Sequence, residues 1–134
     1  MTKRVVFLCL ENANRSQMAE AFARMDGSVE AYSAGSRPSG RVNPLAIAAM
    51  REVGYDLLQH ASKSIDELPD VTFDVAVTMG CGEACPNLRA TRRDDWSIPD
   101  PKHLPPEEFR AVRDLIQTKV QQLLDELKGA CHVD

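Results

Sequence analysis

The sequence has no apolar stretch long enough to span a membrane, and no apolar signal-peptide region follows Met1. The one continuously apolar run near the N-terminus, Val5 to Leu10, is explained by a strand. Positive charge is also limited, since the net charge is −4, which argues against a broad surface for nucleic acid or anionic membranes. We therefore expect a cytoplasmic protein that binds neither, although a local basic pocket is compatible with this charge.

Cysteine is too sparse for a secreted module held together by disulfides. The 134 residues include four cysteines: Cys9, Cys81, Cys85 and Cys131. In a chain without an export signal, thiols more often react or bind metal than form structural disulfides. The length suits one domain with its own core, which we place at residues 1–129, and residues 130–134 are expected to form a loose tail.

Strands and helices are expected to alternate along the chain. The apolar pattern predicts strands at Val5–Leu8, Val29–Ser33 and Phe73–Met79 and a short one around Trp96–Ile98. Helices are predicted at residues 16–25, after the Asn43-Pro44 cap, at residues 64–68, and from Pro105-Pro106 to Gly129. This order predicts a single-domain, doubly wound, four-stranded parallel α/β sheet with helices on both faces, whose ligands bind at the carboxyl ends of the strands.

One cysteine and one arginine stand at such a carboxyl end. Cys9 ends the first strand, and a short loop leads from it to Arg15, where a helix begins. Backbone N–H groups and the helix dipole make this place positive, which can lower the pKa of a thiol from about 8.5 to roughly 3.5–7.5. The guanidinium of Arg15 offers two donors to a tetrahedral anion. We therefore expect Cys9 to be a nucleophile within an oxyanion-binding loop formed by Leu10, Glu11, Asn12, Ala13, Asn14, Arg15 and Ser16.

Two residues of the loop have more specific expected roles. The Ser16 hydroxyl can donate a hydrogen bond to the Cys9 sulfur, and Asn12 tolerates the left-handed backbone angles of a tight loop. The alternative is an ordinary buried cysteine and a solvated Arg15, because C-x5-R alone occurs often by chance. The strand before the motif, the helix after it and the serine directly after the arginine favour the functional interpretation.

A second pair of thiols, Cys81 and Cys85, follows the third expected strand and should lie on the same edge as Cys9. Glycines flank Cys81, so this segment can rearrange at low cost, and the spacing lets the two sulfurs meet. The alternatives are inert buried thiols or a zinc site completed by Cys131 and a histidine. C-x-x-x-C without a second close pair is a weak zinc signature, so we expect no metal and no cofactor.

The three histidines, His60, His103 and His132, show no pairing pattern. We expect each of them to be a surface residue and not a catalyst.

Five segments of the chain occur together in one known family: CLENANRSQMAE (9–20), YSAGS (32–36), VNPLAIAAMREVGYDL (42–57), VTMGCGEACP (77–86) and DDWSIPDP (94–101). They resemble the low-molecular-weight tyrosine phosphatase superfamily and, within it, the arsenate reductases of the thioredoxin-coupled type. The reductase branch is favoured because phosphatases of this fold usually have proline at Gln17. They also tend to have tyrosines at the positions of Lys102 and His103.

The resemblance implies that the protein reduces arsenate to arsenite. Cys9 would attack arsenate, Cys81 would attack the Cys9 sulfur and release arsenite, and Cys85 would then form an exposed disulfide with Cys81. Thioredoxin would reduce that disulfide. The spacing also allows a variant in which a small thiol attacks the Cys9 adduct and the pair plays a lesser part, and the sequence does not rank recycling by a small thiol or glutaredoxin against recycling by thioredoxin. Phosphate and sulfate would bind as analogues of arsenate.

The resemblance also assigns an acid and reveals two departures. Asp100 matches the family's general acid, which would protonate the oxygen that leaves arsenate, while Asp94 and Asp95 are nearby candidates. Glu11 places a carboxylate beside an anion site, where a small or neutral residue is usual, and this could weaken anion binding. Asn14 replaces a cysteine that is common in the reductases.

Related reductases hold a potassium ion behind the loop, and the matching positions here are Asn12, Glu20, Ser33 and Lys63. The first three positions keep their chemistry, whereas the fourth changes from an aspartate to a lysine. We expect the Lys63 ammonium to reach Glu20 and replace the ion, the alternative being a solvated lysine.

Two other functions are open from the sequence alone. A phosphotyrosine phosphatase would use Cys9, Arg15 and Asp100 without the other thiols, and the reductase itself could retain weak phosphatase activity. A metalloid- or zinc-sensing thiol protein would show metal in the purified protein.

Overall fold

The computed structural model describes residues 2–79 and 88–129. The thiols Cys81, Cys85 and Cys131 and the tail expected at residues 130–134 lie outside these described residues. Among the helices that are described, none is long and apolar enough to cross a membrane.

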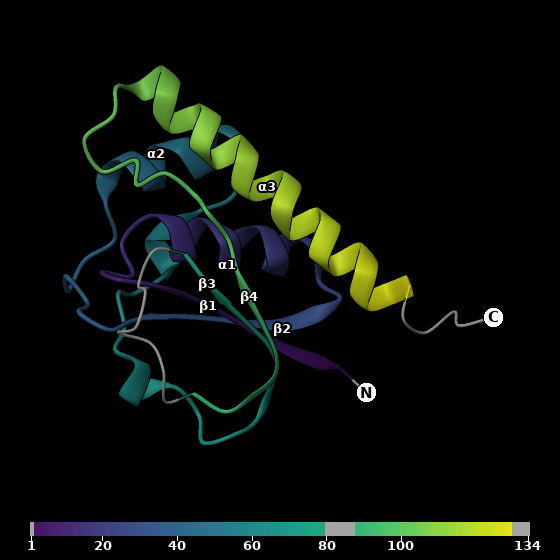
Figure 1. The fold of residues 1–134 in the computed structure, drawn as a ribbon. Helices are drawn as coiled ribbons and strands as arrows, with labels where there is room; N and C mark the ends of the chain where they lie inside the picture. Colours follow the sequence, from purple (N-terminus) through teal and green to yellow (C-terminus); the bar gives the residue numbers. More distant parts are fainter. Residues whose placement is uncertain (1, 80–87, 130–134) are drawn as a thin grey trace.

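Four parallel strands form one sheet in the order β2-β1-β3-β4 (Figure 1). The strands are β1 (Lys3–Cys9), β2 (Val29–Gly35), β3 (Phe73–Thr78) and β4 (Ala90–Asp95). Strand β1 pairs with β2 on one side and β3 on the other, and its apolar residues Val5 to Leu8 are fully buried. The predicted four-stranded parallel α/β sheet is thereby confirmed, with the cysteine-bearing strand at its centre.

The expected position of the fourth strand is wrong. Strand β4 ends immediately before the stretch around Trp96–Ile98 that was expected to form it. Its sequence, ATRRDD, alternates between half-buried and exposed residues at the edge of the sheet, so it contains no apolar run that could reveal a strand. Trp96 and Ile98 are buried instead in the larger core beside the sheet.

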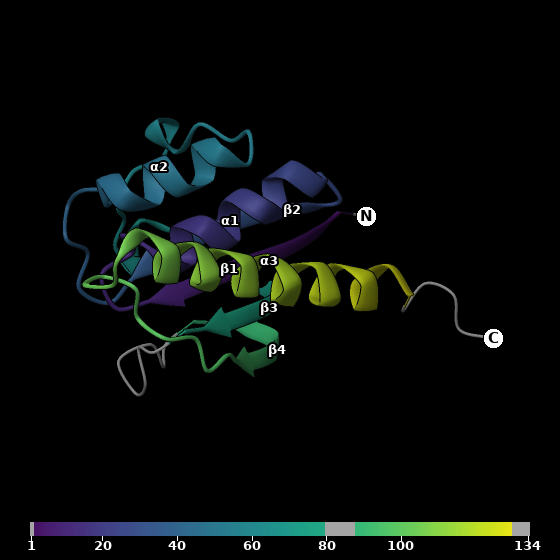
Figure 2. The same cartoon turned by 90° about the horizontal axis from the view of Figure 1, so that it is seen from above.

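Three α-helices cover one face of the sheet: α1 (Arg15–Asp26), α2 (Pro44–Glu52) and α3 (Pro106–Gly129). Figure 2 shows α1 running beside α3 when the molecule is seen from above. The short 3-10 helix η2 (Ile65–Glu67) packs on the opposite face, and a second one, η1 (Leu57–Gln59), joins the larger core through Leu57. Helices thus lie on both faces, as expected, and η2 replaces the predicted helix at 64–68.

The N-termini of α1 and α2 differ in their capping, and the difference matters for anion binding. Helix α2 is capped as predicted, because the Asn43 side chain accepts a hydrogen bond from Leu45 N at 2.9 Å and Pro44 follows. Helix α1 has no side-chain cap from Asn14 and no acidic residue in its first turn. Its N-terminus therefore keeps the positive potential of free N–H groups and points them toward the end of β1.

Candidate active site

Cys9 lies at the carboxyl end of β1 with 3% of its surface exposed. Its sulfur is 2.8 Å from Ser16 Oγ, the contact expected from the sequence. The side-chain amide of Asn12 donates to the same Ser16 oxygen at 2.7 Å. Because that oxygen already accepts a hydrogen bond, the serine hydrogen is free to point at the sulfur.

Asn12 sets the shape of the loop. It is the one non-glycine residue with a positive φ in the described part of the chain, at 51°. Its Oδ1 accepts hydrogen bonds from Gln17 Nε2 at 2.9 Å and from the backbone N–H of Lys63 at 2.8 Å. The expectation that Asn12 adopts left-handed backbone angles is confirmed, and its side chain links the loop to a distant segment.

The expectation that His60 is a surface residue is wrong, since only 5% of its side chain is exposed. Its Nδ1 is 2.8 Å from Gln17 Oε1 and its Nε2 is 2.6 Å from the Tyr55 hydroxyl. The Gln17 amide nitrogen lies within 3.0 Å of three oxygens, so the amide oxygen is the atom that accepts from the ring, which places the histidine hydrogen on Nδ1. Burial lowers the pKa of His60 against the opposing charge of Glu20, which favours the neutral ring.

Hydrogen bonds thus run without a break from Tyr55 through His60 and Gln17 to the loop. Sequence reasoning missed this support because a single histidine outside any periodic pattern gives no signal. Gln17 is a buried amide that needs polar partners, but only the structure reveals that it is buried. His103 is exposed, as expected, and His132 lies outside the described residues.

Arg15 reaches from the start of α1 to the segment after β4. Its Nη1 donates to the carbonyl oxygen of Ile98 at 3.0 Å, and its Nη2 is 3.8 Å from Asp100 Oδ2. The guanidinium is largely buried, whereas 56% of the Asp100 side chain is exposed to solvent. These side chains border a small cavity of about 30 Å³, lined by Cys9, Leu10, Glu11, Asn14, Arg15 and Asp100.

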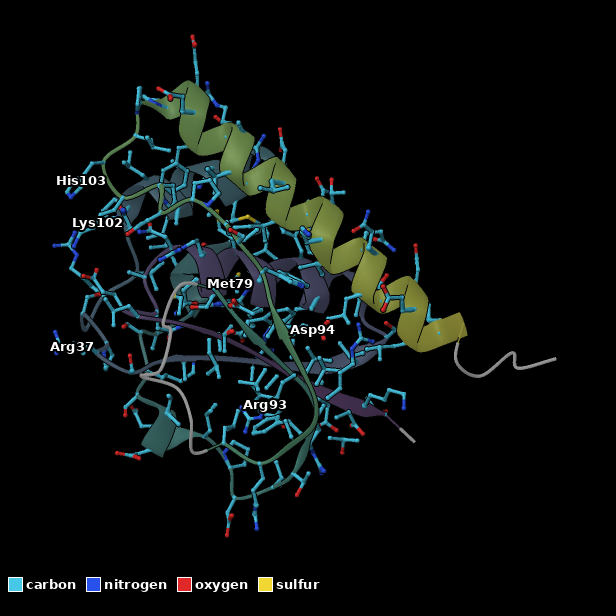
Figure 3. The ribbon with its side chains drawn as sticks, in the orientation of Figure 1. Arg37, Met79, Arg93, Asp94, Lys102 and His103 are labelled. Carbon is cyan, nitrogen blue, oxygen red and sulfur yellow. The ribbon has the colours of Figure 1, made fainter. Side chains whose placement is uncertain are left out.

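The other two candidate acids lie elsewhere. Asp94 pairs with Arg92 at 2.8 Å, and Asp95 accepts a hydrogen bond from Thr78 Oγ1 at 2.8 Å. Figure 3 shows Asp94 well apart from Lys102 and His103, which follow Asp100 at the carboxyl end of the sheet. Of the three candidates, the structure places Asp100 at the cavity.

Glu11, the unusual carboxylate of the loop, is paired. Lys102 Nζ lies 3.0 and 3.2 Å from its two carboxylate oxygens. Both side chains are partly exposed, with 36% of Glu11 and 44% of Lys102 accessible to solvent. The negative charge beside the cavity is therefore compensated by a lysine from a different loop.

Behind the loop, Glu20 is buried among cations. Ser33 Oγ donates to its Oε1 at 2.5 Å, Arg24 Nε donates to its Oε2 at 2.7 Å, and Lys63 Nζ lies 4.0 Å from Oε1. Lys63 thus reaches Glu20 as predicted, although Arg24 makes the closer contact. The oxygens of Asn12, Glu20 and Ser33 are all engaged in hydrogen bonds, and two cationic groups adjoin Glu20, so these residues do not fit a potassium ion.

We expect potassium to leave the stability and activity of the unmodified protein unchanged, because cationic side chains already neutralise Glu20. The measurement is the melting temperature and the rate in potassium chloride against sodium chloride of equal ionic strength. Lys63→Asp should become potassium-dependent, since the substitution restores an anionic ligand. Marked stabilisation or activation of the unmodified protein by potassium would contradict replacement of the ion by lysine.

Gly35, at the end of β2, has no side chain and therefore leaves space for the backbone of the loop. A Cβ atom there would lie 2.6 Å from the carbonyl oxygen of Leu10 and 2.9 Å from the backbone nitrogen of Asn12. We expect Gly35→Ala to push the loop away and to lower the free energy of unfolding by about 1–3 kcal/mol. Chemical denaturation measures this. The control is Gly129→Ala, where a Cβ meets nothing within 4 Å, and equal losses in both variants would refute the steric argument.

In the described residues, no three His, Cys, Asp or Glu side chains gather to form a metal site. The zinc alternative rests on Cys81, Cys85 and Cys131, which are outside that part of the chain.

A cysteine at the end of a parallel strand and an arginine at the start of the next helix, around one small cavity, define a class of α/β proteins suited to hold a tetrahedral oxyanion at a thiol. The chain belongs to the low molecular weight phosphotyrosine protein phosphatase family, whose model matches residues 4–132.

Several proteins similar to this chain are named arsenate reductases. The glutaredoxin arsenate reductase of Synechocystis sp. is 36% identical, over 93% of this chain and 98% of that protein. The arsenate reductase of Staphylococcus aureus strain Newman is 39% identical, over 90% of this chain and 96% of that protein. A solved structure of an arsenate reductase in the phosphate binding state superposes with a TM-score of 0.85 at 35% identity, covering 93% of this chain and 98% of that one.

Proposed function

We propose that this chain reduces arsenate to arsenite with electrons supplied by thiols. The observation that supports this most is the cavity at which Cys9, Arg15 and Asp100 meet, in a chain whose relatives are arsenate reductases. Three side chains from separate elements surround a space suited to one small anion. A phosphotyrosine phosphatase would use the same three groups, but the relatives named as arsenate reductases favour arsenate reduction over this alternative.

In the first step, the Cys9 thiolate attacks the arsenic atom of arsenate, which Arg15 and the N-terminus of α1 hold by hydrogen bonds and positive potential. A sulfur–arsenic bond forms and one arsenic–oxygen bond breaks. Hydroxide is a poor leaving group, so Asp100 donates a proton and water departs. Ser16, 2.8 Å from the sulfur, stabilises the thiolate until the attack.

In the second step, Cys81 attacks the Cys9 sulfur. The new sulfur–sulfur bond displaces arsenic, which keeps the electron pair of the broken bond and leaves as arsenite. Cys85 then attacks Cys81, frees Cys9 as a thiolate and leaves a Cys81–Cys85 disulfide. Two thiols are oxidised for each arsenate reduced, so the electrons balance.

The fold supports the reach of Cys81 to Cys9. Met79, labelled in Figure 3, donates its backbone N–H to the carbonyl oxygen of Leu8 at 2.8 Å. The chain therefore leaves β3 directly beside the end of β1. Cys81 follows Met79 by two residues, and two residues of extended backbone span at most about 7 Å.

The electron donor is proposed to be a cytoplasmic thiol system that is kept reduced by NADPH. The name of the Synechocystis relative supports a glutaredoxin, and the resemblance to thioredoxin-coupled reductases supports thioredoxin. The test is arsenate-dependent NADPH oxidation with thioredoxin and its reductase, compared with glutathione, glutaredoxin and glutathione reductase. Oxidation with at least one system is expected, and its absence with both would refute the proposed function.

A further inference from the structure

The Glu11–Lys102 ion pair joins two loops that face each other across the small cavity. Glu11 follows Cys9 by two residues, and Lys102 follows Asp100 by two residues. The lysine nitrogen contacts both carboxylate oxygens, at 3.0 and 3.2 Å. The pair therefore connects the loop of the nucleophile to the loop of the acid.

Each end of this ion pair is attached to a part of the site. The carbonyl oxygen of Glu11 accepts hydrogen bonds from Ser39 N and Ser62 Oγ, both at 3.0 Å, which fixes the loop beneath its carboxylate. The backbone N–H of Lys102 donates to Asp100 Oδ1 at 3.1 Å. The other oxygen of Asp100 is the one that faces Arg15, at 3.8 Å.

We propose that the Glu11–Lys102 pair is a latch that holds the carboxyl group of Asp100 at the cavity. The side chain of Lys102 anchors its loop to Glu11, and the backbone of the same residue orients Asp100. Glu11 and Lys102 are positioning residues, because they act through Asp100. The kinetic part of this proposal rests on the proposed arsenate reduction.

The pair has a second effect, on charge. Glu11 lines the small cavity and also a neighbouring open cavity of about 340 Å³, to which Lys102 contributes as well. Without the lysine, the carboxylate would repel an incoming oxyanion. Losing either partner opens the latch, but only loss of Lys102 leaves an uncompensated negative charge at the entrance. Both single substitutions should therefore change the position of Asp100, but only loss of Lys102 should weaken the binding of an oxyanion.

The experiment compares Glu11→Gln, Lys102→Gln and the charge exchange Glu11→Lys with Lys102→Glu. The matched control is Lys128→Gln, which removes a partly exposed lysine that bridges α3 and α1 through Asp26 at 3.2 Å, far from the cavity in sequence. Three quantities are measured: amide hydrogen exchange of Asp100, Lys102 and His103, the affinity for inorganic phosphate by calorimetry, and kcat and KM for arsenate.

Both single substitutions should accelerate amide hydrogen exchange at Asp100, Lys102 and His103 and lower kcat by up to about fivefold, the upper end of what a partly exposed ion pair supplies. Lys102→Gln should also weaken phosphate binding and raise KM by a similar factor, whereas Glu11→Gln should not. The double variant Glu11→Lys with Lys102→Glu should restore kcat and slow amide hydrogen exchange again, because it re-forms the ion pair with the charges reversed. Lys128→Gln should match the unmodified protein in all three measurements.

The latch is refuted if Glu11→Gln keeps the exchange rate and kcat of the unmodified protein, since the lysine would then act by charge alone. The latch is also refuted if the double variant Glu11→Lys with Lys102→Glu does not regain the slow amide hydrogen exchange of the unmodified protein. Hydrogen exchange and phosphate affinity need no turnover. An unmodified protein that reduces no arsenate would therefore refute the proposed function, while these two measurements still decide on the latch.

Discussion

Cys9→Ser is expected to abolish arsenate reduction and any hydrolysis of p-nitrophenyl phosphate, with a loss of roughly a thousandfold or more. Both reactions begin with the same thiolate. The attacking atom is the Cys9 sulfur, 2.8 Å from the Ser16 hydroxyl, and a serine hydroxyl in its place remains protonated at neutral pH and is a far weaker nucleophile. The measurements are NADPH-coupled arsenate reduction and release of p-nitrophenol.

The control for this variant is Cys131→Ser, which should be silent because Cys131 has no step in the proposed reaction. Serine is close in size to cysteine, so Cys9→Ser should unfold at the same denaturant concentration as the unmodified protein and should still bind phosphate. Substantial arsenate reduction by a folded Cys9→Ser protein would remove the basis of the proposed mechanism.

The second large effect is expected at Cys81. Cys81→Ser should lose turnover with thioredoxin and its reductase, because the cysteine that displaces arsenic from the Cys9 sulfur is missing. Any phosphatase activity should survive in this variant, because the loop around Cys9 and Arg15 is unchanged. Parallel assays of arsenate reduction and p-nitrophenyl phosphate hydrolysis measure the two outcomes, and equal loss of both would indicate a damaged loop instead of an interrupted relay.

Cys85→Ser serves as the matched variant for the order of the relay. It should permit a single turnover and then stop as a Cys9–Cys81 disulfide, since Cys85, the thiol that resolves this disulfide, is missing. Peptide mapping after arsenate treatment identifies the bond. If Cys81→Ser instead traps a disulfide between Cys85 and Cys9, the two thiols act in the reverse order.

The central part of the site could be predicted because its signals are local. A buried apolar run ending in Cys9 and a helix beginning at Arg15 are read from neighbouring residues, and the expected contact with Ser16 spans a single loop. Asn12 is a similar case, because its tolerance of left-handed angles is a property of the residue type.

The residues that support the site could not be predicted, because their partners are far away in the sequence. His60 meets Gln17 across 43 residues, and Lys102 meets Glu11 across 91 residues. A polar side chain gives no periodic signal of burial, so only the folded chain reveals which partner satisfies it. The resemblance pointed to Lys63 as a partner of Glu20, yet it gave no indication of Arg24.

Strand β4 escaped prediction because it is polar, and the same polarity has a consequence for how the molecule behaves in a crowded solution. Its outer edge has no partner strand in the described structure, so its backbone groups could recruit a strand from another copy. The sequence ATRRDD places two arginines and two aspartates along that edge. Charged side chains on an edge strand oppose such pairing, so the polarity of β4 disfavours strand addition at this edge of the sheet.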